Sequence, residues 1–144
     1  MLLLTSVQCF AAQVLKETSF QDQFDNKLEL NEKIEWLIFT KDKESSNIIN
    51  NVFTELKVID LEKYKVLYVA DISQMPSFVT KLFALPKMKK YSYRIALGKE
   101  GVESKNFPSK KDMITILNLS KLSIVEEIFV NTEPDFKKVW EGID

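Results

Sequence analysis

Two apolar segments of strand length, separated by one amphipathic segment, constrain the fold of this chain more than any other feature. The first covers residues 34–39 and the second residues 65–70. Segments that are apolar almost throughout indicate strands covered on both faces, as in parallel sheets. Between them, apolar residues recur at the spacing of one helical face over residues 44–56: Ile48, Ile49, Val52, Phe53 and Leu56. The pattern predicts a β-α-β unit with parallel strands.

The last third of the chain predicts a β-hairpin followed by a helix. Residues 113–118 and 124–130 are two further apolar segments, and a polar break at Ser120-Lys121 separates them. Thr132 then offers an N-cap oxygen to a terminal helix. The inner face of that helix is expected to carry Phe136, Val139, Trp140 and Ile143.

A second helix is expected after the second apolar strand. Its inner face would carry Phe78, Val79, Leu82 and Phe83, and Pro86 should end or kink it. Residues 93–97 then predict a short strand, and residues 98–112, which contain several lysines, predict a loop.

Near the N-terminus, alternating apolar and polar residues over 20–24 and 27–31 predict two edge strands around a turn at Asp25-Asn26. Residues 1–13 are uncharged and mostly apolar, and small residues lie near their end, which resembles a secretory leader. Cleavage after Ala11 would place the small residues Cys9 and Ala11 where a signal peptidase reads them.

This pattern predicts a signal peptide at residues 1–11 and a single domain over residues 12–144. We then expect a periplasmic or secreted protein without a stable membrane anchor after cleavage. The alternative is an ordinary N-terminal strand in a cytosolic interaction domain.

The chain contains no histidine, and its only cysteine is Cys9. Without histidine there is no imidazole base for a serine or cysteine nucleophile and no histidine ligand for a metal. Without a cysteine in the mature chain there is no thiol chemistry and no disulfide. Thiol-disulfide oxidoreductase and peroxidase activities are therefore not expected.

Charge and glycine content exclude two further classes. Lys and Arg number 20 and Asp and Glu number 21, so the net charge of −1 argues against nucleic acid as a partner. With three glycines, at Gly98, Gly101 and Gly142, the chain has no phosphate-cradling loop of the P-loop or dinucleotide type. We expect no cofactor and no bound metal.

The predicted order of elements is that of the thioredoxin fold, and several local segments resemble the AhpC/TlpA-type thioredoxin-like proteins. Residues 21–39 are similar to their entry, in which a short hairpin with a turn precedes the first core strand, and residues 114–140 are similar to their strand-strand-helix ending. The inserted residues 93–112 resemble exported YtfJ-like members. The resemblance implies an α/β fold: a thioredoxin-like three-layer sandwich with a mixed central sheet flanked by helices.

The resemblance also implies where a redox site would lie. When Phe39 is aligned with the phenylalanine that ends the first core strand, Glu44-Ser45-Ser46-Asn47 occupies the position of the Cys-x-x-Cys motif. Both thiols are absent, so this position is degenerate.

Polar residues follow both predicted core strands at the edge where ligands of parallel sheets gather. They form the first candidate surface: Asp42, Glu44, Ser45, Ser46, Asn47, Asp71 and Ser73. Paired carboxylates can shift each other's pKa or bind a hard cation. The competing interpretation is that Glu44 and the serines cap one helix and Ser73 caps the next.

A cationic and aromatic segment forms the second candidate surface, for contact with an acidic partner: Lys87, Lys89, Lys90, Tyr91, Tyr93 and Arg94. Arg94, the only arginine, can hold a carboxylate in bidentate fashion. The competing interpretation is that lysines at a helix end complement its dipole and that the tyrosines pack at the rim of the core.

Three hypotheses follow from the sequence. The first is an exported thioredoxin-fold protein that acts as a non-catalytic binding or assembly module for another protein. The second is an enzyme that uses the strand-edge acids Asp42, Glu44 and Asp71, alone or with a cation. The third is a cytosolic interaction domain.

Overall fold

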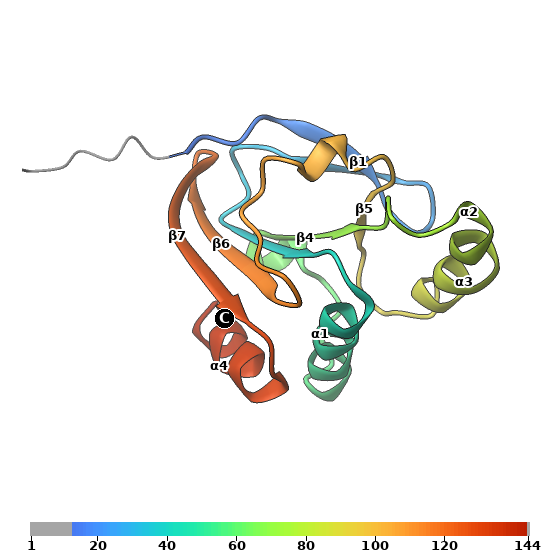
Figure 1. Cartoon of the computed structure of the whole chain (residues 1–144). Helices are drawn as coiled ribbons and strands as arrows, with labels where there is room; N and C mark the ends of the chain where they lie inside the picture. Colours follow the sequence, from blue (N-terminus) through green and yellow to red (C-terminus); the bar gives the residue numbers. More distant parts are fainter. Residues whose placement is uncertain (1–12, 144) are drawn as a thin grey trace, which may run out of the picture.

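The computed structural model describes residues 13–143, which form a seven-stranded mixed sheet with helices packed against it (Figure 1). The leader predicted at residues 1–11 lies outside the described residues. The spatial order of the strands is β2-β1-β5-β4-β3-β6-β7. Their bounds are β1 Thr18–Gln21, β2 Lys27–Leu30, β3 Trp36–Thr40, β4 Val66–Asp71, β5 Ala96–Gly98, β6 Ile114–Ser120 and β7 Ser123–Val130.

The predicted β-α-β unit lies at the centre of the sheet. Strands β3 and β4 are parallel, with Trp36 opposite Val66 and Thr40 opposite Ala70, and helix α1 (Lys43–Glu55) connects them. Strand β5 also pairs with β4 in parallel, whereas β1, β2, β6 and β7 pair antiparallel with their neighbours. The prediction of a mixed sheet is confirmed.

The predicted hairpin and terminal helix are confirmed as β6, β7 and α4 (Glu133–Ile143). Lys121 and Leu122 connect the two strands with φ values of 47° and 68°, the left-handed conformation that suits two-residue hairpin turns. The N-cap prediction also holds, because the amide of Asp135 donates to Oγ1 of Thr132 at 3.2 Å.

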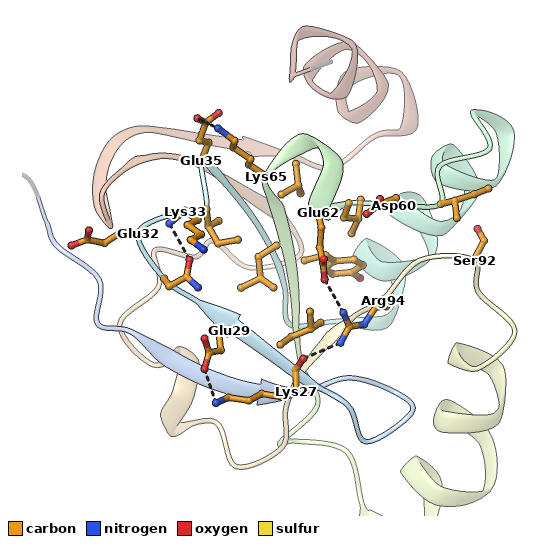
Figure 2. Close-up of a pocket in the computed structure, with 18 residues that line it drawn as sticks. Lys27, Glu29, Glu32, Lys33, Glu35, Asp60, Glu62, Lys65, Ser92 and Arg94 are labelled. Carbon is orange, nitrogen blue, oxygen red and sulfur yellow. Dashed lines mark hydrogen bonds and ion pairs between the residues drawn. The ribbon is translucent and has the colours of Figure 1, made fainter.

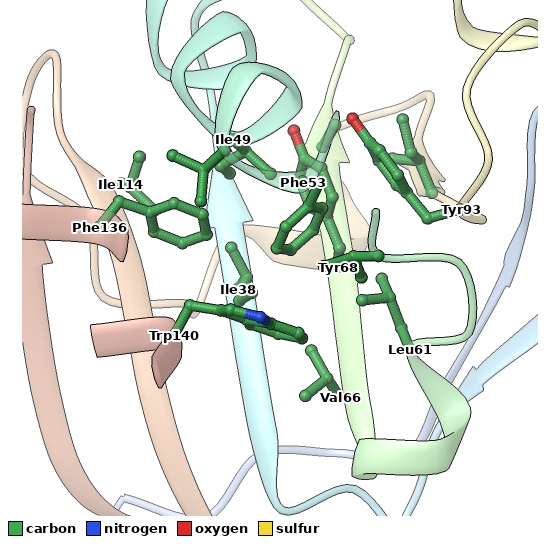
Figure 3. Close-up of a cluster of buried hydrophobic side chains, with 14 of the residues drawn as sticks. Ile38, Ile49, Phe53, Leu61, Val66, Tyr68, Tyr93, Ile114, Phe136 and Trp140 are labelled. Carbon is green, nitrogen blue, oxygen red and sulfur yellow. The ribbon is translucent and has the colours of Figure 1, made fainter. Parts of the chain in front are cut away.

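Alternate residues of the central strands pack into two hydrophobic clusters, one on each face of the sheet. On one face, Ile38 and Tyr68 pack with Phe53 of α1 and with Phe136 and Trp140 of α4 (Figure 3). On the other face, a second cluster joins central-strand residues to the β1–β2 hairpin and the loop before β6: Leu37, Phe39, Leu67, Val69, Phe20, Leu28, Leu30 and Phe107. The α/β class, with a mixed sheet flanked by helices, is confirmed.

The first strand is displaced from its predicted position. The alternating pattern predicts a strand over residues 20–24, but β1 ends at Gln21 because the next residue closes the turn. Oδ1 of Asp22 accepts hydrogen bonds from the amides of Phe24 (2.8 Å) and Asn26 (2.9 Å). A carboxylate that bonds nearby amides in this way favours a turn over a strand.

The second helical segment differs from the prediction in both its inner face and its response to proline. It runs over residues 77–88 as α2 (Ser77–Val79), a π-helical turn η2 (Thr80–Ala84) and α3 (Leu85–Met88). The residues that pack on the core are Leu85 and Met88, whereas Phe78, Leu82 and Phe83 are exposed. The prediction of an inner face at Phe78 and Leu82 was wrong, because the periodicity shows that a helix has an apolar face but not that the face is covered.

Pro86 does not end this segment, since α3 continues to Met88. The amide of Leu85 donates to the carbonyl of Thr80, five residues back, which widens the turn ahead of the proline. Pro86 then lies in the first turn of α3, where a missing amide proton costs little. Within residues 13–143, no helix is both long and apolar enough to span a membrane.

Candidate functional site

The N-terminus of α1 is closed by Asp42, which lies directly before the helix. Its Oδ1 accepts from the amide of Ser45 at 2.8 Å, and its Oδ2 accepts from the Ser45 hydroxyl at 2.8 Å. Ser45 is buried, and Glu44 is exposed. The prediction that Glu44 and the serines cap this helix was therefore wrong in detail: Asp42 is the cap, and Ser45 is a donor to it.

A short chain of hydroxyl groups links this helix start to the core. Oγ1 of Thr40 lies 3.1 Å from Oγ of Ser46 and 3.2 Å from the Tyr68 hydroxyl. Burial raises the pKa of Tyr68 to about 12, even though the hydrogen bonds from Ser46 and Thr40 oppose this effect. The tyrosine therefore stays protonated at physiological pH and is a hydrogen-bonding group, not a base. Nothing in the strand pattern distinguishes Tyr68 from an ordinary core residue.

Asp71 and Ser73 form a second polar cluster, at the end of β4. Oδ1 of Asp71 accepts from the amide (2.9 Å) and the hydroxyl (2.6 Å) of Ser73, and Oδ2 lies 3.5 Å from the hydroxyl of buried Ser104. One interpretation of the sequence predicted that Ser73 caps the second helix. That prediction was wrong, because the helix begins four residues later, at Ser77. A Cβ at Gly101 would lie 2.8 Å from Oγ of Ser73, and the φ of Gly101 is +82°, so glycine suits this close approach.

Asp42 and Asp71 each bond within a cluster of their own, and no hydrogen bond joins the two clusters. Across residues 13–143, no three carboxylate, histidine or cysteine side chains are placed to hold a metal ion together. The hypothesis of a carboxylate enzyme with Asp42, Glu44 and Asp71 gains no support from this arrangement.

The second candidate surface divides into an exposed part and a core part. Lys89 and Lys90 are exposed, and exposed Lys87 donates to Oδ1 of Asn47 on α1 at 3.3 Å. Tyr91 is half-buried and stacks on Tyr93 with the ring centroids 5.4 Å apart.

Tyr93 is a core residue, which corrects its assignment to a partner-binding surface. It is 2% exposed, and its hydroxyl donates to Oδ1 of Asn50 on α1 at 2.9 Å. Burial raises the pKa of Tyr93, so the phenol remains protonated.

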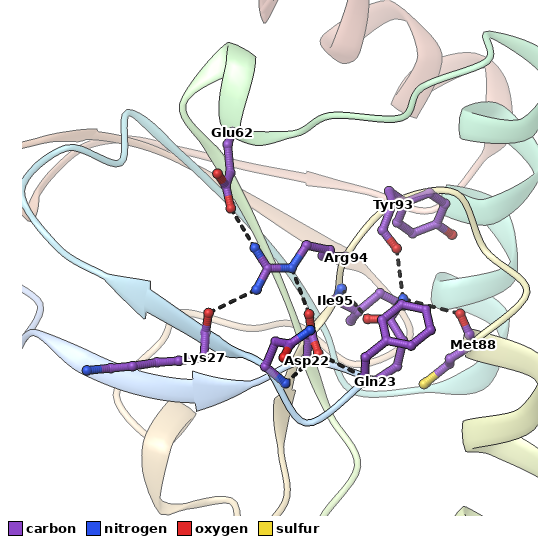
Figure 4. Close-up of polar contacts among 10 residues, drawn as sticks. Asp22, Gln23, Lys27, Glu62, Met88, Tyr93, Arg94 and Ile95 are labelled. Atoms are coloured by element: carbon purple, nitrogen blue, oxygen red, sulfur yellow. Dashed lines mark hydrogen bonds and ion pairs between the residues drawn. The ribbon is translucent and has the colours of Figure 1, made fainter.

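Arg94 is likewise hydrogen-bonded within the molecule (Figure 4). Its guanidinium donates to Oδ2 of Asp22 at 2.7 Å, to Oε1 of Glu62 at 2.7 Å and to the carbonyl of Lys27 at 2.9 Å. Arg94 thus bonds two carboxylates of its own chain, with one hydrogen bond to each, and not one carboxylate in the predicted bidentate fashion. Arg94 ties the β1–β2 hairpin to the 3-10 turn η1 (Glu62–Tyr64).

The carboxylate of Asp22 is fully buried in this network. Burial would raise its pKa, but the hydrogen bonds from Arg94 and from the amides of Asn26 and Phe24 outweigh that effect and lower the pKa below its ordinary value. Asp22 is therefore ionised at neutral pH. Its sequence signal was an Asp-x-x-Asp-Asn turn, which predicted the bend but not the ion pair.

A groove of about 1110 Å³ lies beside this network (Figure 2). Its walls come from β2, the segment before β3, η1 and the start of β4, and its rim carries both signs of charge: Lys27, Glu29, Glu32, Lys33, Glu35, Asp60, Glu62, Lys65 and Arg94. Val66 is the first residue of β4, so the groove borders the N-terminal end of that strand, whereas Asp71 is its last residue. No local sequence pattern indicates this groove, because its walls come from segments far apart in the chain.

No protein-family model and no curated protein matches the sequence. Solved structures do resemble the fold. A Chlorobium tepidum protein assigned as the thiol:disulfide interchange protein DsbE has a TM-score of 0.61 and 12% identity over 92% of this chain and 93% of that chain. Peroxidoxin BcpB from Mycobacterium tuberculosis has a TM-score of 0.59 and 10% identity over 92% and 94% of the two chains.

StoA from Bacillus subtilis has a TM-score of 0.57 and 16% identity over 87% of this chain and 96% of that chain. These similarities extend over nearly the whole of each chain and define the class: the protein has a thioredoxin-like fold. With Cys9 as its only cysteine, it is a thioredoxin-like chain without a Cys-x-x-Cys motif.

Proposed function

We propose that this protein is an exported, non-catalytic binding module on a thioredoxin-like scaffold, with another protein as its partner. One observation carries the proposal. The resemblance implies the Cys-x-x-Cys position at residues 44–47, and at this helix start the polar groups of Asp42, Ser45 and Ser46 bond to one another. The Ser45 hydroxyl donates to the carboxylate that caps the helix. Because the chain has no histidine, no imidazole base is available to activate this hydroxyl as a nucleophile.

The surface around this helix start remains suited to recognition. Glu44 is exposed, and the half-buried Asn47 is joined to Lys87 of the neighbouring helix. These groups offer both signs of charge and an amide on one edge of the scaffold. Such groups contribute orientation and specificity in protein interfaces more than raw affinity.

The absence of thiol chemistry is tested by a disulfide-reduction assay with insulin as substrate, using the full chain and its Cys9→Ser variant. We expect both proteins to leave the rate at that of the uncatalysed reaction. Turnover by the unmodified chain that disappears in the Cys9→Ser variant would overturn the proposal.

The binding surface is tested by a photo-crosslinking amino acid placed at Glu44 or Asn47 in the native cell. A control protein carries the crosslinker at Glu126 on β7, which is also exposed. We expect one discrete protein adduct from each of the first two positions and none from the control. Adducts of equal yield from all three positions would argue against a specific surface at this edge.

Export is tested separately by N-terminal sequencing of protein purified from native cells. The proposal expects a new N-terminus after Ala11. An intact Met1 in the mature, functional protein would favour the cytosolic alternative.

A further inference from the structure

An apolar patch on the second helical segment belongs to neither hydrophobic cluster. Its side chains are 63%, 65% and 66% exposed: Phe78, Leu82 and Phe83. The opposite side of the same segment, at Leu85 and Met88, packs against the core. The segment is thus anchored on one side and presents a second apolar side to the surroundings, a feature that marks interaction sites on protein surfaces.

Four lysines lie within this helical segment or directly after it: Lys81, Lys87, Lys89 and Lys90. All four are exposed, and within residues 13–143 none of them takes part in an ion pair. No acidic residue occurs anywhere between Asp71 and Glu100, although the whole chain has a net charge of −1. The patch therefore lies in a locally positive region of a slightly acidic protein.

The position of this segment bears on the kind of surface it fits. Figure 1 shows α2 and α3 at one end of the molecule, on the far side of α1 from α4. A stable protein interface needs about 800 Å² from each partner, which three side chains on one short helical segment supply only in small part. Insertion into a lipid interface needs no complementary pocket, and its strength grows with apolar area and with attraction to anionic headgroups.

We propose that the apolar patch and the four lysines dock the protein reversibly on an anionic membrane surface. Phe78, Leu82 and Phe83 enter the boundary between headgroups and acyl chains. The lysine stems lie along the apolar surface, and their ammonium groups reach the phosphates. This inference goes beyond the proposed function, because it requires no partner protein and no spanning helix.

The test is flotation of the full chain with vesicles of phosphatidylcholine and phosphatidylglycerol at a ratio of 7:3, with pure phosphatidylcholine vesicles for comparison. We expect binding to the anionic vesicles that weakens as NaCl is raised, because salt screens the lysines. The variant Phe78→Ser/Leu82→Ser/Phe83→Ser should lose at least tenfold in the vesicle partition coefficient. The variant Lys81→Glu/Lys89→Glu/Lys90→Glu should lose at least as much.

The control variants carry the same kinds of substitution at exposed positions outside the patch. Ile59→Ser/Val125→Ser removes two apolar side chains that are 67% and 63% exposed elsewhere. Lys105→Glu/Lys111→Glu/Lys138→Glu makes the same charge change at other exposed lysines. Both controls should bind like the unmodified chain, and all variants should keep its circular dichroism spectrum and melting temperature.

Three outcomes would overturn the inference. They are equal binding to neutral and anionic vesicles, equal binding by all variants, and no vesicle binding at all. A crosslinker at Phe83 that captures one acidic protein while anionic vesicles leave the chain unbound would assign the patch to that protein instead.

Discussion

Asp22 and Gln23 show how two adjacent residues in one turn organise segments far apart in the sequence. Asp22 accepts from Arg94, which also bonds Glu62, so the turn holds both the segment before β5 and the one before β4. Gln23 is 2% exposed and bonds three backbone groups in the segment 88–95. Buried polar side chains of this kind stabilise a fold only while every partner is in place.

Replacing Asp22 with Asn should lower the free energy of unfolding by about 2 kcal/mol at pH 6, as expected for a hydrogen bond that involves charged groups. Because the pKa of Asp22 is lowered in the folded state, its contribution is fully present above the unfolded pKa of about 4. The contribution is lost as the pH falls through the lower, folded pKa. Urea denaturation should therefore show a smaller difference between the two proteins at pH 3 than at pH 6.

The control for this prediction is Asp25→Asn. The Asp25 side chain is 80% exposed, and asparagine tolerates its φ of 62°. We expect its stability to stay within about 0.5 kcal/mol of the unmodified chain. A similar loss in both variants would contradict a specific role for the Asp22–Arg94 pair.

At the scale of the element, side chains decide where helices and strands begin and end. The pattern predicts a strand over residues 93–97, but β5 begins at Ala96. Before it, Gln23 supplies the partners: its Oε1 accepts from the amide of Ile95, and its Nε2 donates to the carbonyl of Tyr93. The side chain satisfies backbone groups that a longer strand would have paired.

Replacing Gln23 with Leu should cost about 3 kcal/mol or more, because it leaves three backbone groups of the segment 88–95 without partners. Chemical denaturation measures this loss. Gln21→Leu, at an exposed position of β1, is the matched control and should change stability by about 0.5 kcal/mol at most. Equal losses in the two variants would contradict the assignment.

The start of α1 gives a second prediction at this scale. Asp42→Ala should destabilise the protein by about 1–2 kcal/mol, because the amide and the buried hydroxyl of Ser45 both lose their acceptor. Asp42→Asn should recover part of this loss. The control is Glu44→Ala, because Glu44 lies in the first turn of the same helix but is exposed. It should change the thermal melting midpoint much less than Asp42→Ala does. A larger effect at Glu44 would identify Glu44 as the cap instead.

At the scale of the whole molecule, aromatic rings join the two helices on one face of the sheet. The ring of Phe53 lies 5.0 Å from Tyr93, 5.6 Å from Phe136 and 4.8 Å from Trp140, measured between centroids. Phe53 therefore connects α1 to α4 and to the segment before β5. Without a disulfide among residues 13–143, such packing carries the stability of the domain.

Phe53→Ala should cost about 3–5 kcal/mol in the free energy of unfolding, the usual loss for a buried phenylalanine. Phe78→Ala removes the same atoms from a helical segment where the ring is 63% exposed, and it should cost less than about 1 kcal/mol. Differential scanning calorimetry of the two variants compares them directly. Similar melting temperatures would contradict the assignment of Phe53 to the core and Phe78 to the surface.

The central strands, the hairpin and the terminal helix could be predicted because their patterns are local. An apolar segment such as residues 34–39 has few alternatives to a buried strand, and Thr132 caps its helix through residues close to it in sequence. Part of the candidate site was equally local, since Asp42 and Ser45 bond within one helical turn. The chain by itself also determined that no histidine and no Cys-x-x-Cys pair is available, because composition alone limits which reactive groups exist.

Only the tertiary structure decided which apolar face is covered and which charges are paired. The spacing of Phe78 and Leu82 is the same whether the core lies beneath them or solvent does. Arg94 meets Asp22 across 72 residues of sequence, and no local pattern fixes such a distance. Long-range contacts depend on how all the elements pack together. The exposure of Phe78 and Leu82 and the partner of Arg94 are therefore set by the packing of the sheet and its helices, not by the local sequence.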